Sequence, residues 1–121
     1  MPTSEHFSNN ELSCNHCGKN EMDPEFLSWL EQVRELYGKP MVLSSAYRCP
    51  EYNAQVSSTG TTGPHTTGKA VDVLVNGKDA VRLERAAVLL CVNGKGTKQK
   101  GPWGGRFLHL DLVDRKAIWS Y

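Results

Sequence analysis

Two short stretches of alternating side chains constrain the fold of this chain more than any other feature. Residues 69–75 place Asp72 between valines, and residues 106–113 place His109 and Asp111 between leucines. Side chains alternate between the two faces of a β-strand, so each stretch predicts a strand with one apolar face and one face that carries ionisable groups. If the two strands are neighbours in one sheet, Asp72, His109 and Asp111 converge on the same face.

Helical patterns flank these strands. Asp23 followed by Pro24 predicts the start of a helix, because aspartate caps free N–H groups and proline fits the first helical position. Apolar side chains then recur at helical spacing until Gly38, which predicts the end of that helix. A second helix is expected over residues 80–91, with Asp79 as its cap.

The other segments are shorter or less regular. We expect a strand over 41–45, one or two helical turns over 50–56, a polar loop over 57–64 and a mobile loop over 93–105, which is rich in glycine and lysine. The strand over residues 106–113 is the last one expected. Neither an internal repeat nor a long linker divides the chain, so we expect a single domain over residues 1–121.

Size and charge exclude several classes of protein. The chain has 121 residues, of which 39% are apolar and 22% charged, as expected for one folded domain rather than a disordered segment. The formal net charge of +1 provides no basic field for nucleic acid. No segment approaches the roughly 20 apolar residues of a membrane span, and the N-terminus has no secretory signal. We therefore expect a cytoplasmic protein that neither binds nucleic acid nor inserts into a membrane.

Asp72 is the residue that points most directly to a metal ion. A carboxylate within an apolar strand is costly unless it is paired or bound to a metal. Asp72 and His109 lie together if their strands pair, and the loop that carries His65 can close over them. Two neutral imidazoles and one carboxylate suit Zn²⁺ and leave a position for water. The alternative is a structural His–Asp hydrogen bond, but the combination of these residues favours the metal.

The spacing of these residues resembles that of a known family. The segment from His65 to Asp72 has the pattern His-x-x-Gly-x-Ala-x-Asp, and His109 follows at a distance. This arrangement is similar to that of the zinc D-Ala-D-Ala carboxypeptidases and L-Ala-D-Glu endopeptidases, peptidase family M15, which includes phage endolysins. The resemblance extends over most of the chain, from about residue 7 to residue 113.

The resemblance implies a fold and a substrate. The fold is α+β, with a small antiparallel sheet and helices packed on one side, as in hedgehog-type domains. The implied cofactor is one Zn²⁺ held by His65, Asp72 and His109. The implied substrate is the peptidoglycan stem peptide.

The segment Ser45-Ala-Tyr47-Arg48 is similar to a Ser-x-Tyr-Arg segment upstream of the first zinc ligand in the same family. The resemblance implies that Arg48 holds a substrate carboxylate or stabilises an oxyanion, roles that suit its planar guanidinium. The alternative is a surface arginine that caps the turn before Pro50. Ser45 and Tyr47 are predicted to line the same substrate-binding site, and Asn53 to support its loop.

One position departs from the family pattern. Many relatives carry an acid three residues before the second zinc histidine, but this chain has Arg106 there, which cannot act as a base. Asp111 shares a face with His109 and is our candidate for the general base, which makes it a catalytic residue. The alternative is that Asp111 only orients the His109 ring.

The cysteines suggest a second kind of site. Cys14-x-x-Cys17 followed by glycine resembles half of a zinc knuckle. A full structural site needs two more ligands, and the spacing of the candidates is not diagnostic. Those candidates are Cys49, Cys91, His16 and His6. Buried or paired cysteines are the alternative that we favour, with free thiols expected in the cytoplasm.

Together, the motifs predict a zinc peptidase that cleaves amide bonds in the peptide part of bacterial peptidoglycan, as a D-Ala-D-Ala carboxypeptidase or an L-Ala-D-Glu endopeptidase. With no secretory signal, we expect a monomeric phage or prophage lysis enzyme that reaches the wall after release. The alternative, motivated by Arg106, is a non-catalytic zinc-binding relative that acts in a virion or binds the cell wall. A nucleic-acid module around Cys14 and Cys17 is disfavoured by the near-neutral charge.

Overall fold

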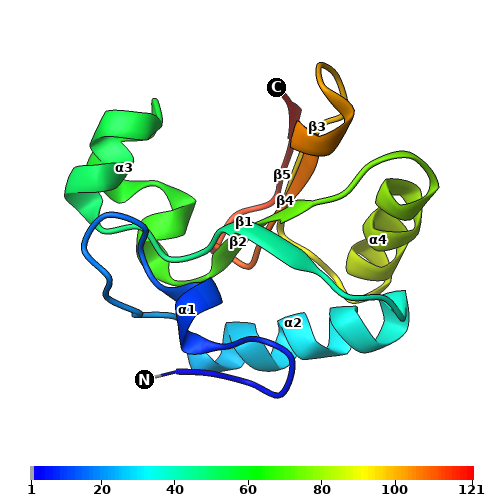
Figure 1. Cartoon of the computed structure of the whole chain (residues 1–121), viewed down its shortest axis with the longest axis horizontal. Coiled ribbons are helices and arrows are strands. Elements are labelled where there is room, and N and C mark those ends of the chain that lie inside the picture. The colour runs from blue at the N-terminus through cyan, green and yellow to red at the C-terminus, as the bar shows by residue number, and fades with distance from the viewer. Residues whose placement is uncertain (1) are drawn as a thin grey trace.

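The computed structural model describes residues 2–121 and contains a five-stranded sheet with the strand order β1-β2-β4-β3-β5 (Figure 1). The strands are β1 (Val42–Ser45), β2 (Ala70–Leu74), β3 (Gly94–Lys98), β4 (Phe107–Asp111) and β5 (Ala117–Ser120). Neighbouring strands are antiparallel, except that β3 and β5 are parallel. Helices combined with this mostly antiparallel sheet confirm the predicted α+β class.

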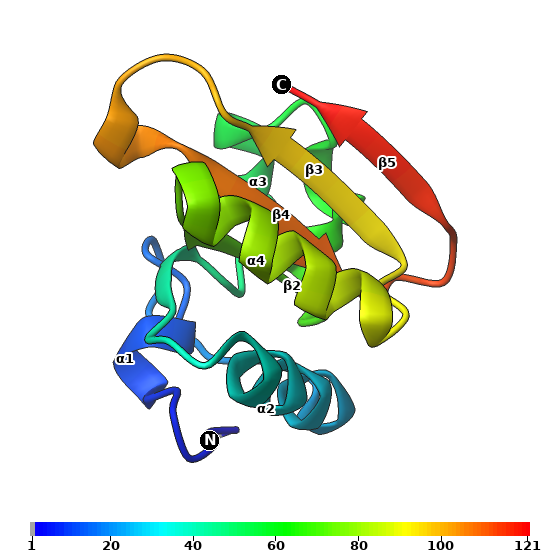
Figure 2. The same ribbon diagram turned by 90° about the vertical axis from the view of Figure 1, so that its right-hand side faces the viewer.

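Helices lie on both sides of the sheet. The α-helices are α1 (Asn9–Leu12), α2 (Pro24–Tyr37), α3 (Pro50–Val56) and α4 (Gly77–Leu89), and the 3₁₀ helices are η1 (Gly60–Thr62), η2 (Pro64–Thr67) and η3 (Trp103–Gly105). Figure 2 shows α4 in front of the strands and α3 behind them, while α2 packs against α4. The two longer helices therefore lie on one side of the sheet, and the short helix α3 lies on the other, where it packs on η1 and η2 rather than on the strands. No helix among residues 2–121 is long and apolar enough to cross a membrane.

The start of α2 is confirmed and the start of α4 is corrected. The Asp23 side chain accepts a hydrogen bond from the Phe26 amide, as expected of an N-cap, and the helix ends at Gly38. Helix α4 begins earlier than predicted, with Asn76 as its N-cap residue. Asp79 lies inside the first turn, where its carboxylate pairs with a lysine of the α2–β1 connection rather than with the helix end.

The predicted mobile loop over residues 93–105 is wrong. Its first half forms β3, which lies between β4 and β5 in the sheet. Strand β5 was not predicted either. The Gly-Lys-Gly-Thr-Lys sequence of β3 has little apolar character and two glycines, so local strand propensity is low and pairing on both sides has to supply the order.

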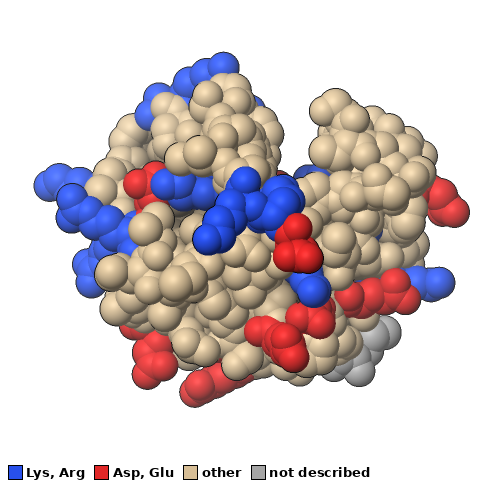
Figure 3. Space-filling model, turned by 180° about the vertical axis from the view of Figure 1, so that it is seen from behind, with Lys and Arg blue, Asp and Glu red and all other residues tan. Residues whose placement is uncertain are grey.

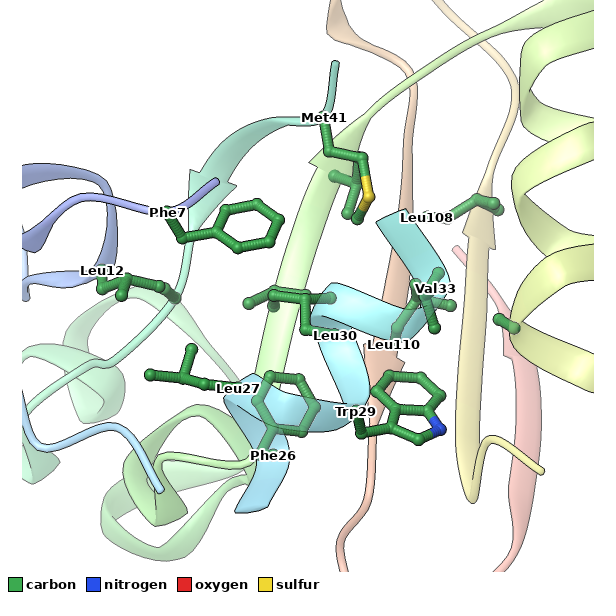
Figure 4. Close-up of a cluster of buried hydrophobic side chains, with 14 of the residues drawn as sticks. Phe7, Leu12, Phe26, Leu27, Trp29, Leu30, Val33, Met41, Leu108 and Leu110 are labelled. Carbon is green, nitrogen blue, oxygen red and sulfur yellow. The ribbon is translucent and has the colours of Figure 1, made fainter. Parts of the chain in front are cut away.

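The hydrophobic core lies between α2 and the apolar face of β2 and β4 (Figure 4). Val71 of β2 and Leu110 of β4 are fully buried and are partners across the two strands. Leu30 and Val33 of α2 are also fully buried against this face. The alternation read from the sequence is therefore confirmed, and it leaves the opposite face of β2 and β4 for polar side chains.

We expect Leu30→Ala to destabilise the fold by about 2–5 kcal/mol, because it removes a fully buried side chain and leaves a cavity. Leu36→Ala in the same helix is the matched control, since Leu36 is 50% exposed, and we expect a change within about 0.5 kcal/mol. Urea unfolding at a fixed metal concentration measures both. Equal effects of the two substitutions would contradict this position for the core.

Candidate metal centre

The pairing of β2 with β4 creates the centre of the site. Asp72 and His109 are Cα partners across the antiparallel pair, so their side chains leave the sheet side by side. Both point away from the face that α2 covers, because their neighbours Val71, Val73, Leu108 and Leu110 occupy the core. The prediction that these two strands are neighbours is confirmed.

His65 reaches the same point from η2. Its Nε2 lies 3.2 Å from Asp72 Oδ1, and His109 Nδ1 lies 3.0 Å from the same oxygen. One ligand atom from each of the three residues lies within 4.8 Å of the other two, and all three residues are buried. Two imidazole nitrogens and a carboxylate oxygen that converge in this way form a donor set that a divalent transition metal accepts.

Hydrogen bonds behind the rings decide which nitrogen faces the centre. His65 Nδ1 donates to the Ala46 carbonyl oxygen at 2.7 Å, which turns Nε2 toward Asp72. His109 Nε2 donates to Asp111 Oδ2 at 2.6 Å, which turns Nδ1 toward Asp72. A histidine that binds a metal makes a hydrogen bond through its other ring nitrogen, and this bond fixes the orientation of the ring and its tautomer. The site therefore turns His65 Nε2 and His109 Nδ1 toward Asp72, as a metal ion between the three residues requires.

Asp111 lies behind His109 and not on the open side of the site. It is fully buried, and it accepts hydrogen bonds from His109, the Val113 amide and both terminal nitrogens of Arg115. Burial opposes its ionisation, but hydrogen bonds from His109 and Arg115 outweigh burial and lower its pKa. This geometry favours the orienting role for Asp111 and argues against our prediction that it is the general base.

The ionisation of the ligands follows from their contacts. Burial raises the pKa of Asp72, but hydrogen bonds and charge from His109 and His65 outweigh it and hold the pKa of this carboxyl well below its usual range. Burial lowers the pKa of His109, but hydrogen bonds to Asp111 and Asp72 outweigh it and raise the pKa. A proton therefore competes with a metal ion for His109 Nδ1, and it does so at higher pH than for an ordinary histidine.

A cavity of about 570 Å³ opens over these residues. Arg48 and residues 56–59 lie on one side of it, next to the α3 region, and β4 and β5 form the other. Figure 3 shows a notch at the upper edge of the molecule, where α3 and the end of the sheet stand apart. His65, Asp72 and His109 all line the cavity, so the candidate metal position is open to a ligand.

Arg48 is fixed at the cavity by three side chains. Its Nε donates to Ser45 Oγ at 3.0 Å, Nη1 donates to Asn53 Oδ1 at 3.1 Å, and Nη2 lies 3.4 Å from Asp72 Oδ2. Ser45 and Asn53 therefore hold the guanidinium, and neither lines the cavity. Such a fixed guanidinium beside a metal position can bind a carboxylate or a developing negative charge.

Tyr47 lies elsewhere. It is buried, its hydroxyl group donates to Glu21 Oε2 at 3.0 Å, and it does not line the cavity. Tyr47 contacts Glu21 whereas Arg48 contacts Asp72, so the two neighbouring side chains lie apart. The structure therefore does not support our prediction that Tyr47 binds substrate.

No free carboxylate lines the cavity among residues 2–121, since Asp72 is the only acidic residue there. Arg106 is also outside it, with its guanidinium 4.9 Å from the centre of the Trp103 ring and its Nε bonded to the Gly101 carbonyl. No residue of the described cavity wall therefore replaces the acid that many relatives carry at the position of Arg106.

The residues that form the far wall of the cavity were not predicted from the sequence. Trp119 of β5 lies with its ring centre 4.9 Å from that of His109, and the Arg115 guanidinium lies 5.5 Å from the centre of the Trp119 ring. Gly96 of β3 makes this possible, because a Cβ atom there would collide with the Trp119 indole. The alternation of Trp119 and Tyr121 near the C-terminal end was the available signal.

Comparison with known families agrees with this geometry. A sequence model of the family described as Peptidase M15 matches residues 5–111, which is most of the chain. The chain belongs to this peptidase family. Peptidases of the M15 family depend on a metal ion, and the matched range includes His65, Asp72 and His109. No curated protein matches the chain.

We expect His65→Ala, Asp72→Ala and His109→Ala each to remove one equivalent of divalent metal, because each deletes one of three converging donors. His6→Ala is the control, since His6 binds Glu31 and takes no part in the site. Elemental analysis after dialysis measures the loss. Metal affinity should also fall as the pH drops through the raised pKa of His109, and unchanged metal content in the His109 variant would contradict the assignment.

We expect Asp111→Asn to keep the fold and to weaken metal binding by about 10- to 100-fold, because it removes the charged partner that orients His109. Activity should return when excess metal is added. Activity against metal concentration measures this directly. A loss of turnover that saturating metal does not restore would indicate a catalytic proton transfer by Asp111 instead.

Proposed function

We propose that the protein is a zinc peptidase that hydrolyses amide bonds in the peptide part of bacterial peptidoglycan. The observation that carries this proposal is the convergence of His65 Nε2 and His109 Nδ1 on Asp72 Oδ1, in a cavity that Arg48 also lines. Nitrogen and carboxylate donors favour Zn²⁺ over Mg²⁺ or Ca²⁺, and three protein ligands leave one position open. Membership of the M15 family supports a metal-dependent peptidase.

The chemistry divides between the ion and the chain. When bound by these residues, zinc supplies a Lewis acid that polarises a peptide carbonyl and lowers the pKa of water. Arg48, held by Ser45 and Asn53, binds the carboxylate of the stem peptide or the charge that develops on the scissile carbonyl. Trp119 and Phe107 form an apolar wall that reduces the access of bulk water.

Two cleavage sites fit this arrangement. A D-Ala-D-Ala carboxypeptidase would place the terminal carboxylate of its substrate on Arg48, whereas an L-Ala-D-Glu endopeptidase would place an internal carboxylate or the oxyanion there. Mass spectrometry of the fragments released from purified murein distinguishes the two products. We further propose that residues 1–121 form one domain that acts as a monomer, in phage or prophage lysis.

A second candidate is a non-catalytic relative that binds zinc and serves as a virion or wall-binding module. The cavity wall favours it in one respect, because Asp72 is the only acidic residue that lines the cavity among residues 2–121. Binding to murein without release of any fragment, by zinc-loaded protein, would support this candidate. Release of a stem-peptide fragment that stops in the Asp72→Ala variant would support the peptidase.

We expect Arg48→Lys to lower kcat/KM by about 10- to 100-fold, because lysine keeps the charge and loses the planar fork that makes charge-assisted hydrogen bonds. Bound zinc should be unchanged, since Arg48 is no ligand. Arg85→Lys on α4 is the control, because Arg85 does not line this cavity. Turnover on murein together with zinc analysis measures both. Wild-type turnover in Arg48→Lys would remove Arg48 from the mechanism.

A further inference from the structure

Three cysteines from separate parts of the chain meet away from the cavity. Cys14 and Cys17 come from the segment before α2, and Cys49 is the residue before α3. Their sulfur atoms lie within 4.8 Å of one another, and none is in a disulfide. Cys14 and Cys49 are buried, whereas Cys17 is exposed. The fold therefore supplies the third thiol that the half-knuckle lacked in the sequence.

The backbone around Cys14 is folded as a tight turn that favours a thiolate. The Gly18 amide donates to the Cys14 carbonyl at 2.9 Å, and Gly18 has φ of 75°, a conformation in which a side chain is strained. The amides of His16 and Cys49 point at Cys14 Sγ, at 3.4 and 3.3 Å. Two N–H donors directed at one sulfur stabilise its charged form.

His16 lies beside the Cys49 sulfur and offers a fourth donor, although its ring nitrogens do not lie within 4.8 Å of all three sulfurs. Its Nδ1 lies 3.7 Å from Cys49 Sγ. Two ligands of a tetrahedral zinc, one sulfur and one nitrogen, lie about 3.6 Å apart when the zinc–sulfur and zinc–nitrogen distances are ordinary. The His16 ring also stacks on Tyr52 of α3, with centres 5.5 Å apart and planes 2° from parallel, which holds the imidazole over this end of α3.

We propose that Cys14, Cys17, Cys49 and His16 form a second metal site, a closed Cys₃His site that binds Zn²⁺. Three thiolates and an imidazole are soft donors that select zinc over Mg²⁺ and Ca²⁺, and the thiol protons pass to solvent on binding. Four protein ligands leave no position for water, so the site is structural. It is separate from the His65, Asp72 and His109 site and stands whether or not the chain is a peptidase.

The second site acts on the position of Arg48. Cys49 is the next residue along the chain, and the Arg48 amide donates to the His65 carbonyl at 3.1 Å. A metal that joins Cys49 to the segment of Cys14 and Cys17 fixes the start of α3 against the N-terminal part of the chain. The second metal site therefore also holds the Arg48 guanidinium and the metal ligand His65 in position.

Cobalt substitution tests the proposal. Metal-free wild type and His109→Ala, which lacks a ligand of the other site, are each loaded with Co²⁺, and absorption from thiolate-to-cobalt charge transfer is recorded. We expect the band in both proteins and its loss in Cys17→Ser, with Cys91→Ser as the control because Cys91 is exposed and outside the cluster. His16→Ala should weaken cobalt binding by about 10-fold or more, as loss of one of four ligands requires.

Two results would overturn the proposal: no charge-transfer band in the wild type, or an undiminished band in Cys17→Ser. Thiol counting on the zinc-loaded wild type keeps the test open if Cys17→Ser fails to fold. Before chelation we expect only Cys91 to react rapidly with Ellman's reagent, and after chelation three further thiols. Three thiols that already react before chelation, or a pair that reacts only after reduction, would mean free cysteines or a disulfide instead.

Discussion

The register between β2 and β4 determines everything that follows at the site. Because Asp72 is the partner of His109, the two ligands leave the sheet together, and the adjacent partners Val71 and Leu110 lie on the opposite, buried face. A slip of one residue would reverse the faces of one strand and bury a carboxylate in the core. The apolar packing against α2 therefore fixes the position of Asp72 and His109, although these apolar side chains are not part of the metal site.

The site is built in layers behind His109. The ring contacts Asp111, and Asp111 in turn accepts from Arg115 and from the Val113 amide. A buried carboxylate with an ion pair is a poor source of stability, because desolvation offsets most of the attraction. Its value here is directional, since it holds one ring nitrogen protonated and the other available. Arg48 and Asp72 form a second ion pair beside the metal position, in which Arg48 Nη2 lies 3.4 Å from Asp72 Oδ2.

The parts of this arrangement that could be predicted are those with a local pattern. Alternation predicted β2 and β4, and the residues around Asp23 predicted α2, so the convergence of Asp72 and His109 followed from the sequence. Strand β3 was missed because its order comes from neighbours on both sides and not from its own residues. The direction of Tyr47 depends on a contact with Glu21, which no spacing reveals.

Contacts distant in sequence account for the rest. The position of Asp111 behind the ring, rather than beside the open metal position, depends on Arg115, which belongs to the turn before a strand that was not predicted. Cys49 is placed beside Cys14 and Cys17 by the path of the chain through α2 and β1. In both cases the residues were visible as candidates, and only the fold selected among the alternatives.

The two walls of the cavity differ in how firmly they are attached. Trp119 and Tyr121 belong to β5 or follow it directly, and β5 is an edge strand whose one partner in the sheet is β3. Asp72 and His109 lie on β2 and β4, which are paired on both sides, whereas His65 comes from η2. An edge strand separates at a smaller free-energy cost than the centre of a sheet, so β5 can open locally while β2 and β4 stay paired. The aromatic wall of the cavity is therefore attached less firmly than the two strands that carry Asp72 and His109.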